Sequence, residues 1–250
     1  VLSTITAFAG NGGSTAVDEE KSASNSKTLA SHAPIYIDGN ADFSDADDDG
    51  VSNPGAAGTE NDPYIIENLD IDASSANGIE VRNTDVYFVI RNCRVYEGGS
   101  THSGIYFYNV KDGKIENTTA YDNYRGIYLS SSSNNNITNC QIYSNAWRGI
   151  DLSSSSNNNL VNCFAYNSGV GFAVEYSSND NQIINCSSNN TSGIGICIYS
   201  SSNNNQIVNC TFYDNSYYGI WIHSSSSNEI TNCVCHDNSY SIWLYYYSND

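Results

Sequence analysis

The sequence predicts an all-β fold, a single-stranded right-handed parallel β-helix of about eight or nine coils with about 23 residues per coil. Two markers recur in step along the chain. A Gly or, in the last repeat, a Ser precedes an apolar residue at Gly78, Gly104, Gly126, Gly149, Gly171, Gly195, Gly219 and Ser241. An Asn precedes a small residue at Asn92, Asn117, Asn139, Asn162, Asn185, Asn209 and Asn232. Two markers locked to one period are typical of a solenoid.

Within each repeat the apolar residues alternate with period two, which indicates short strands rather than helices. Examples are Ile127 with Leu129, Ile150 with Leu152, and Ile220 with Ile222. Polar runs such as residues 130–136 supply turn chemistry. We therefore expect three strands per coil, each paired in parallel with its counterpart one coil away, and a right-handed path because parallel crossovers are nearly always right-handed.

Equivalent positions of stacked coils lie above one another, so the repeat predicts ladders of like side chains. We expect an inward ladder of Ile137, Leu160, Ile183, Ile207 and Ile230. We expect a second inward ladder of Cys93, Thr118, Cys140, Cys163, Cys186, Cys210 and Cys233. The outward ladder three residues later is Tyr96, Tyr121, Tyr143, Tyr166, Asn189, Tyr213 and His236. The Asn before each small residue is expected at a bend, where its amide can bond to those of neighbouring coils.

The chain divides into two parts. Residues 1–33 read as a signal-peptide remnant and a flexible linker, because Val1 is no translation start, Ala7-Phe8-Ala9 fits a cleavage pattern, and few large apolar residues follow. The alternative is a strand-forming or disordered N-terminus. Residues 34–250 are expected to form the β-helix, with an acidic loop insertion at 42–62. This organisation indicates a secreted or cell-surface protein.

Charge and hydropathy limit the kinds of binding partner that we expect. The chain has nine Lys and Arg residues and 27 Asp and Glu residues, for a net charge of -18. Such a charge repels phosphate backbones and favours cations or neutral ligands such as glycans. We expect no nucleic-acid partner. No uninterrupted apolar stretch reaches the roughly 18 residues of a membrane span, so no transmembrane segment is expected.

The acidic insertion contains a candidate structural calcium site at Asp45, Asp47, Asp49 and Asn53. Carboxylates at alternate positions before a Gly converge on a hard cation. Ala56 stands where an EF-hand would have its bidentate Glu, which excludes an EF-hand. The alternative is a solvated acidic loop.

Eight cysteines in an exported chain raise the question of disulfides. Six of them share one inward ladder position, Cys235 takes the next inward position, and only Cys197 is expected outward. Stacked neighbours lie farther apart than the roughly 3.8 Å between Cβ atoms that a disulfide prefers. We therefore expect free buried thiols, with some disulfides or a metal-binding cysteine ladder as the alternatives.

The repeat Gly-Ile-Tyr-Leu-Ser-Ser-Ser-Ser-Asn-Asn-Asn-Ile-Thr-Asn at 126–139 resembles that of archaeal secreted and cell-surface right-handed β-helix proteins. This repeat is similar to those of the NosD-like and pectate-lyase-like groups. Residues 33–40 and 62–67 resemble the first coil of the archaeal proteins. The resemblance covers residues 34–250 and implies the fold and a surface location, but it implies no activity, since the repeat is a scaffold.

The function predicted from these features is a noncatalytic extracellular or cell-surface structural or adhesive module. An unpaired end of the solenoid favours end-to-end self-assembly into filaments or a surface layer, unless the natural chain continues. No catalytic residues are predicted, because the chain has few basic residues, although Arg125 and Arg148 stack one coil apart.

The alternative is a carbohydrate-binding or carbohydrate-active β-helix, similar to polysaccharide lyases or hydrolases. Exposed aromatic rings can stack on the sugars of surface glycans. The candidate aromatic ladder for ligand binding is Tyr96, Tyr121, Tyr143, Tyr166 and Tyr213. Tyrosine also simply suits an exposed strand. Among the sequons, Asn136 and Asn189 are the expected glycosylation sites.

Overall fold

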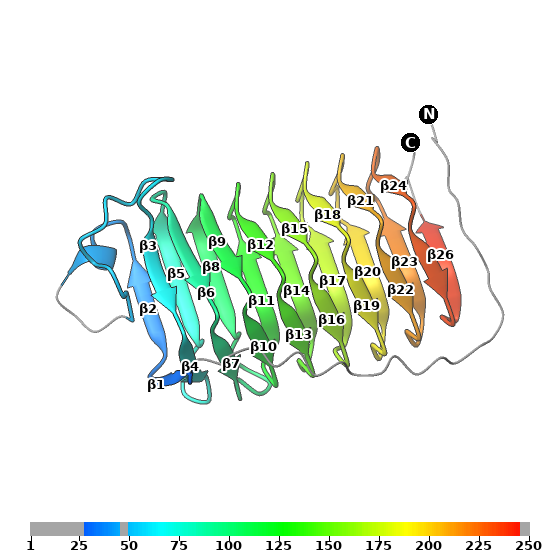
Figure 1. The fold of residues 1–250 in the computed structure, drawn as a ribbon. Helices are drawn as coiled ribbons and strands as arrows, with labels where there is room; N and C mark the ends of the chain where they lie inside the picture. The colour runs from blue at the N-terminus through cyan, green and yellow to red at the C-terminus, as the bar shows by residue number, and fades with distance from the viewer. Residues whose placement is uncertain (1–27, 46–49, 246–250) are drawn as a thin grey trace.

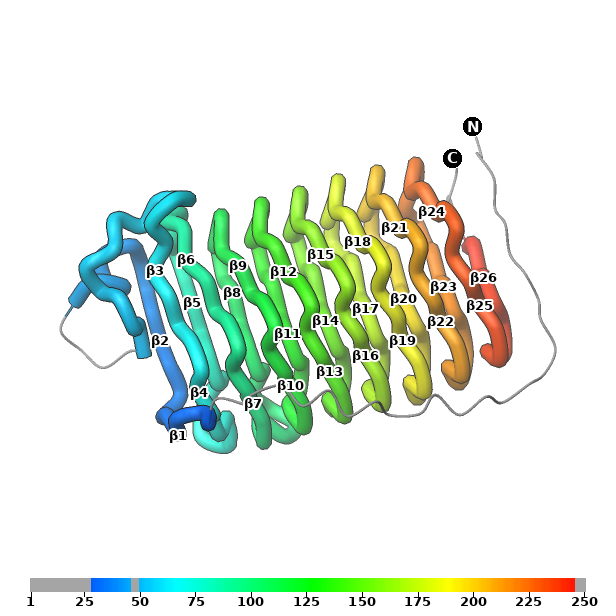
Figure 2. Tube along the Cα trace, in the orientation of Figure 1, coloured from blue at the N-terminus to red at the C-terminus, as the bar shows by residue number. Residues whose placement is uncertain are grey.

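The computed structural model describes residues 28–45 and 50–245, and these form one right-handed parallel β-helix (Figure 1). Its roughly eight turns hold about 23 residues each, which confirms the predicted fold. Three parallel sheets run along the stack, with nine, nine and eight strands. The tube in Figure 2 shows the coils stacked along one axis. The described part of the chain holds no helix that could span a bilayer.

We name the sheets A, B and C. Sheet A comprises β1 (Ala30–His32), β4 (Leu69–Asp72), β7 (Arg94–Tyr96), β10 (Thr119–Tyr121), β13 (Gln141–Tyr143), β16 (Phe164–Tyr166), β19 (Ser187–Asn189), β22 (Thr211–Tyr213) and β25 (Val234–His236). Sheet B comprises β2 (Ile35–Asp38), β5 (Ile79–Thr84), β8 (Ile105–Val110), β11 (Arg125–Ser130), β14 (Arg148–Ser153), β17 (Val170–Glu175), β20 (Ile194–Tyr199), β23 (Tyr218–His223) and β26 (Tyr240–Tyr245). Sheet C comprises β3 (Tyr64–Glu67), β6 (Phe88–Arg91), β9 (Gly113–Glu116), β12 (Asn136–Thr138), β15 (Asn159–Val161), β18 (Gln182–Ile184), β21 (Gln206–Val208) and β24 (Glu229–Thr231).

The core consists of ladders, because each inward side chain stacks on its equivalent in the next coil. Ile137 pairs with Leu160 and Leu160 with Ile183, and the ladder continues through Ile207 to Ile230, as predicted. Its first four members are at most 1% exposed. Burial of such side chains contributes roughly 1.5–3 kcal/mol each.

Asparagines make the bends. The Asn before each small residue has a φ between 50° and 55°, a left-handed conformation that Asn tolerates better than most residues. This confirms the predicted bend, where Asn162 donates to Asn139 at 3.1 Å. A longer amide ladder, which the sequence analysis missed, lies inside the turns between sheets B and C. It is formed by Asn135, Asn158, Asn181, Asn205 and Asn228, whose side chains bond to one another at 3.0–3.1 Å.

The paired structure starts before the boundary predicted at residue 34, since Ala30 N donates to Asn68 O at 2.9 Å. Strand β1, whose side chains are mostly exposed, pairs in parallel with β4. The segment between β2 and β3 contains the one 3₁₀ helix of the described residues, η1 (Asp42–Ser44). Phe43 is 1% exposed and packs on Tyr64 and Phe88, with ring centroids 5.1 and 5.0 Å away. The segment therefore covers the core near the N-terminal end of the stack.

All eight cysteines are buried free thiols in the structure. Cys186 Sγ accepts the Cys163 N–H at 3.4 Å and lies 3.5 Å from the carbonyl oxygen of Leu160. Cys197 takes the outward register predicted for it, between Ala173 and Trp221, yet it is only 3% exposed. Burial raises the pKa of Cys197 to about 12 and that of Cys235 likewise to about 12.

We expect the eight thiols to resist alkylation in the folded protein, because burial keeps them from the reagent. In denaturant without reductant, all eight should label, as mass spectrometry would show. Incomplete labelling in denaturant would reveal disulfides and contradict the free-thiol ladder.

Candidate functional site

Sheet A presents the predicted tyrosine ladder on its outer face. Tyr96, Tyr121, Tyr143 and Tyr166 stack in sequence, with centroids 5.5, 4.8 and 4.9 Å apart and interplanar angles of 15° or less. Each inner ring therefore covers the faces of its neighbours. A sugar needs an open ring face to stack on. Ligand binding by these tyrosines stays a prediction.

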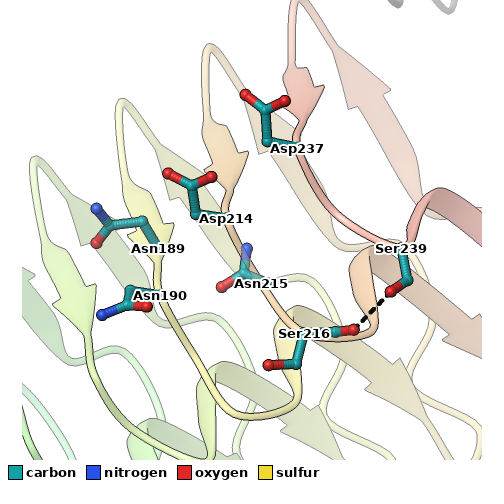
Figure 3. A pocket seen from close by; sticks show the side chains of 7 residues that line it. All are labelled: Asn189, Asn190, Asp214, Asn215, Ser216, Asp237 and Ser239. Atoms are coloured by element: carbon teal, nitrogen blue, oxygen red, sulfur yellow. Dashed lines mark hydrogen bonds between the residues drawn. The ribbon is translucent and has the colours of Figure 1, made fainter. Parts of the chain in front are cut away.

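Asn189 interrupts this ladder before Tyr213, and an open polar hollow of about 670 Å³ lies there (Figure 3). Its lining residues are Asn189, Asn190, Asp214, Asn215, Ser216, Asp237 and Ser239. Ser239 Oγ donates to the carbonyl oxygen of Ser216 at 2.7 Å. The lining has neither an aromatic ring nor a cation, so we assign the hollow no ligand.

The outer face of sheet B carries the chemically richest surface. Its first outward column reads Tyr106, Tyr128, Asp151, Ala173, Cys197, Trp221 and Trp243 in successive coils. Two residues on, a second column reads Tyr108, Ser130, Ser153, Glu175, Tyr199, His223 and Tyr245. Strand β11 begins with Arg125 and strand β14 with Arg148, and the two arginines pair in register as predicted. Parallel register thus gathers charges and rings from distant parts of the chain.

Four of these residues form what we call the charge cluster: Arg125, Arg148, Asp151 and Glu175. Asp151 Oδ2 accepts from Arg125 Nε at 2.7 Å and from Arg148 Nη1 at 2.8 Å. Arg148 Nη2 donates to Glu175 Oε2 at 2.8 Å and to the Tyr199 hydroxyl at 2.7 Å. Two cations and two anions thus neutralise one another across three coils.

Aromatic rings fix the two guanidinium groups of the charge cluster. Arg148 Cζ lies 4.0 Å from the ring centroid of Trp147. Arg125 Cζ lies 4.3 Å from the rings of both Trp147 and Tyr128. These are cation–π contacts, which strengthen when they are removed from water. The guanidinium of Arg125 is therefore held between rings as well as by Asp151.

Burial governs the electrostatics of the charge cluster. Asp151, Glu175 and Arg148 are 0%, 3% and 5% exposed. Burial raises the pKa of Asp151 and that of Glu175, against the opposing charges of the arginines. Burial also opposes the charge of Arg148, but its hydrogen bond with Glu175 and the charge of Asp151 outweigh this and raise the pKa of Arg148. As built, neither carboxylate is open to a ligand.

Toward the C-terminal end, sheet B carries a second aromatic group, which we call the downstream aromatic cluster. It comprises Tyr199, Tyr218, Trp221, Tyr240 and Trp243. Its nearest ring pairs are mostly tilted, by 33° between Tyr199 and Trp221 and 47° between Tyr218 and Trp243. Tyr240 is 52% exposed and Trp243 38% exposed. Tyr240 and Trp243 on β26 are therefore exposed, whereas Tyr199, Tyr218 and Trp221 are half-buried.

The family model described as a right-handed beta helix region matches residues 33–188 and 177–250. The chain belongs to this β-helix family. A comparison with curated protein sequences found no significant match.

Several solved structures share the fold of this β-helix. Pectate lyase Pel9A is 15% identical, with a TM-score of 0.59 over 89% of this chain and 68% of its own. The mannuronan C-5 epimerase AlgE6 A-module of Azotobacter vinelandii is 16% identical, with a TM-score of 0.59 over 85% of this chain and 63% of its own. Tailspike protein 2 of bacteriophage CBA120 is 13% identical, with a TM-score of 0.56 over 89% of this chain and 42% of its own. The chain spans less than two thirds of the epimerase module and of the tailspike domain, and identities this low show the fold alone.

The predicted calcium site of this β-helix lies partly outside the described residues, since Asp47 and Asp49 fall there. Asn53 uses its amide within the loop: its Oδ1 accepts from Ile65 N at 2.6 Å and its Nδ2 donates to Pro63 O at 3.0 Å. Among the residues that are described, no group of three acidic, His or Cys side chains could hold a metal. Calcium binding by Asp45, Asp47 and Asp49 stays a prediction.

The two expected glycosylation sites lie on strands. Asn136 begins β12 and Asn189 ends β19, and both side chains are half-buried. Their modification also stays a prediction.

The sequence analysis missed Asp151, Glu175 and Tyr199 as partners of the arginines. The signal was present in the repeat, because the three residues take outward positions on the Gly-Ile strands of successive coils. Following each outward column through the register would have placed Asp151 beside the arginines and Glu175 before Tyr199.

Proposed function

We propose that this β-helix is a noncatalytic extracellular or cell-surface module that binds carbohydrate through the outer face of sheet B. The observation that carries the proposal is the set of tilted rings in the downstream aromatic cluster, of which Tyr240 and Trp243 are exposed. Such rings stack on the apolar faces of sugars, while their polar edges bond to hydroxyls. The names of the similar structures, a pectate lyase and a mannuronan epimerase, agree with a carbohydrate ligand.

The charge cluster supports binding rather than catalysis. Glycoside hydrolysis needs two carboxyl groups that reach the scissile bond. Asp151 and Glu175 are the carboxylates at the centre of this face, but both are buried and bonded to Arg148. Their bonds hold the rings and Arg125 in place, which gives a ligand a rigid surface and lowers the entropic cost of binding.

An adhesive or structural role follows from a rigid rod that holds glycans along one face. End-to-end self-assembly into filaments or a surface layer is a separate proposal, and glycan binding does not depend on it. A polysaccharide lyase or hydrolase-like activity is the competing function.

A glycan array combined with product analysis of the same glycans separates binding from catalysis. We expect the purified protein to retain at least one glycan and to leave all of them uncleaved. Reproducible cleavage that is lost in an Arg125→Ala variant would overturn the noncatalytic proposal. Absence of retention on a broad array would overturn carbohydrate binding itself.

A further inference from the structure

Aromatic groups on the outer face of sheet B fall into two kinds, which differ in whether they contain a cation. In the N-terminal half each group surrounds a guanidinium of the chain itself. Arg82 Cζ lies 5.4 to 5.9 Å from the rings of Tyr36, Tyr106 and Tyr108. Arg125 lies between Tyr128 and Trp147. The electron-rich ring faces there are already occupied.

Among residues 28–45 and 50–245, no guanidinium lies over a ring of the downstream aromatic cluster. Tyr218 is its centre, with ring centroids 5.4 Å from Tyr240, 5.6 Å from Trp243 and 6.5 Å from Trp221. The sequence contains no Lys or Arg after Arg148. Arg148 itself reaches only the hydroxyl of Tyr199, and among the described residues no guanidinium lies over a ring of this cluster.

The register shows which residues take the position of the arginines in later coils. In β11 and β14 the residue before the repeated Gly is Arg125 or Arg148, and in β17 and β20 the equivalent residues are Val170 and Ile194. In β23 the position is filled by Tyr218. The later coils therefore carry apolar or aromatic residues, and no cation, at this position.

The part of the chain that follows Arg148 is acidic. Every charged residue of fixed sign after Arg148 is acidic: Asp151, Glu175, Asp180, Asp214, Glu229, Asp237 and Asp250. Asp214 and Asp237 precede Tyr218 and Tyr240 in the same two coils. Figure 3 shows the two aspartates on one side of the stack. His223, with its ring centroid 5.5 Å from that of Trp221, is the ionisable base beside the cluster.

We propose that the downstream aromatic cluster binds an organic ammonium group supplied by the ligand, as an amino sugar with a free amine would carry. Ring faces attract cations through their quadrupole, most strongly for Trp. The acidic half of the chain raises the local concentration of cations. The identification of the ligand as a sugar rests on the proposed function, whereas the preference for an ammonium group rests on the cluster alone.

The test uses choline and its neutral isostere 3,3-dimethylbutan-1-ol, titrated into the full chain by NMR or calorimetry. Choline should bind at least about tenfold more tightly than the isostere, a difference typical of a cation–π site. Equal binding of the two probes, or no binding of choline, would overturn the proposal.

Two variants keep this test independent of folding defects. Ile194→Arg supplies a guanidinium at the register position that Arg125 and Arg148 occupy upstream, and it should abolish choline binding. Ile194→Gln, of similar length but uncharged, should leave choline binding intact. Equal effects of the two variants would overturn the proposal. Glycan retention without a preference for choline would contradict the ammonium site but leave the proposed carbohydrate binding standing. Choline binding without glycan retention would contradict carbohydrate binding but leave the ammonium site standing.

Discussion

Replacing Arg148 by alanine is expected to destabilise this β-helix by about 3–5 kcal/mol, because the change leaves two buried carboxylates without their shared partner. Arg148 bonds to both Asp151 and Glu175 in a region that is almost closed to water. The free energy of unfolding, measured by urea titration with circular dichroism, checks this.

Arg94→Ala is the matched control. Arg94 also pairs with an aspartate, Asp70, one coil away, but its side chain is 46% exposed. Exposed pairs contribute only about 0–1 kcal/mol. If Arg148→Ala lowers the free energy of unfolding no more than Arg94→Ala does, Arg148 does not hold the charge cluster together.

Gly149→Ala is expected to destabilise the fold by about 1–3 kcal/mol or more, because the added methyl group has no space. A Cβ at Gly149 would lie 2.5 Å from the carbonyl oxygen of Gly171 and 3.1 Å from Cβ of Ala165. The first contact is with the backbone of the next coil, which cannot move without disturbing the parallel pairing. Thermal or urea unfolding of the variant measures the loss.

Gly55→Ala provides the comparison for this variant. A Cβ at Gly55 meets nothing within 4 Å, so this alanine should be nearly neutral. Equal stability of the two variants would contradict the close stacking of successive coils at the Gly-Ile strand.

The repeat made the fold predictable, because stacking forces one residue type on every coil. The Ile137 to Ile230 ladder and the inward cysteines follow from spacing alone, without any knowledge of long-range contacts. The outer face obeys no such rule, since an outward position tolerates Tyr128, Asp151, Ala173 and Trp221 in turn. Its chemistry has to be read coil by coil through the register.

Burial on the outer face could not be inferred from alternation. Cys197 points outward by register but is closed off from water in the folded chain. The sheet A tyrosines were correctly placed, but their mutual stacking depends on ring orientation, which spacing does not determine. The missed amide ladder from Asn135 to Asn228 depends on turn geometry, since several successive asparagines compete for the one inward position.

The central claim is that glycan binds to the outer face of sheet B, and calorimetric titration of one array-positive glycan into three proteins tests it most directly. Trp221→Ala removes a ring of the downstream aromatic cluster, and Tyr143→Ala removes a ring of the sheet A ladder. We expect Trp221→Ala to bind about tenfold more weakly than the unaltered protein, in line with the loss of one aromatic contact, and Tyr143→Ala to bind as tightly. Weakening by Tyr143→Ala with full affinity in Trp221→Ala would place the ligand on sheet A and contradict this account.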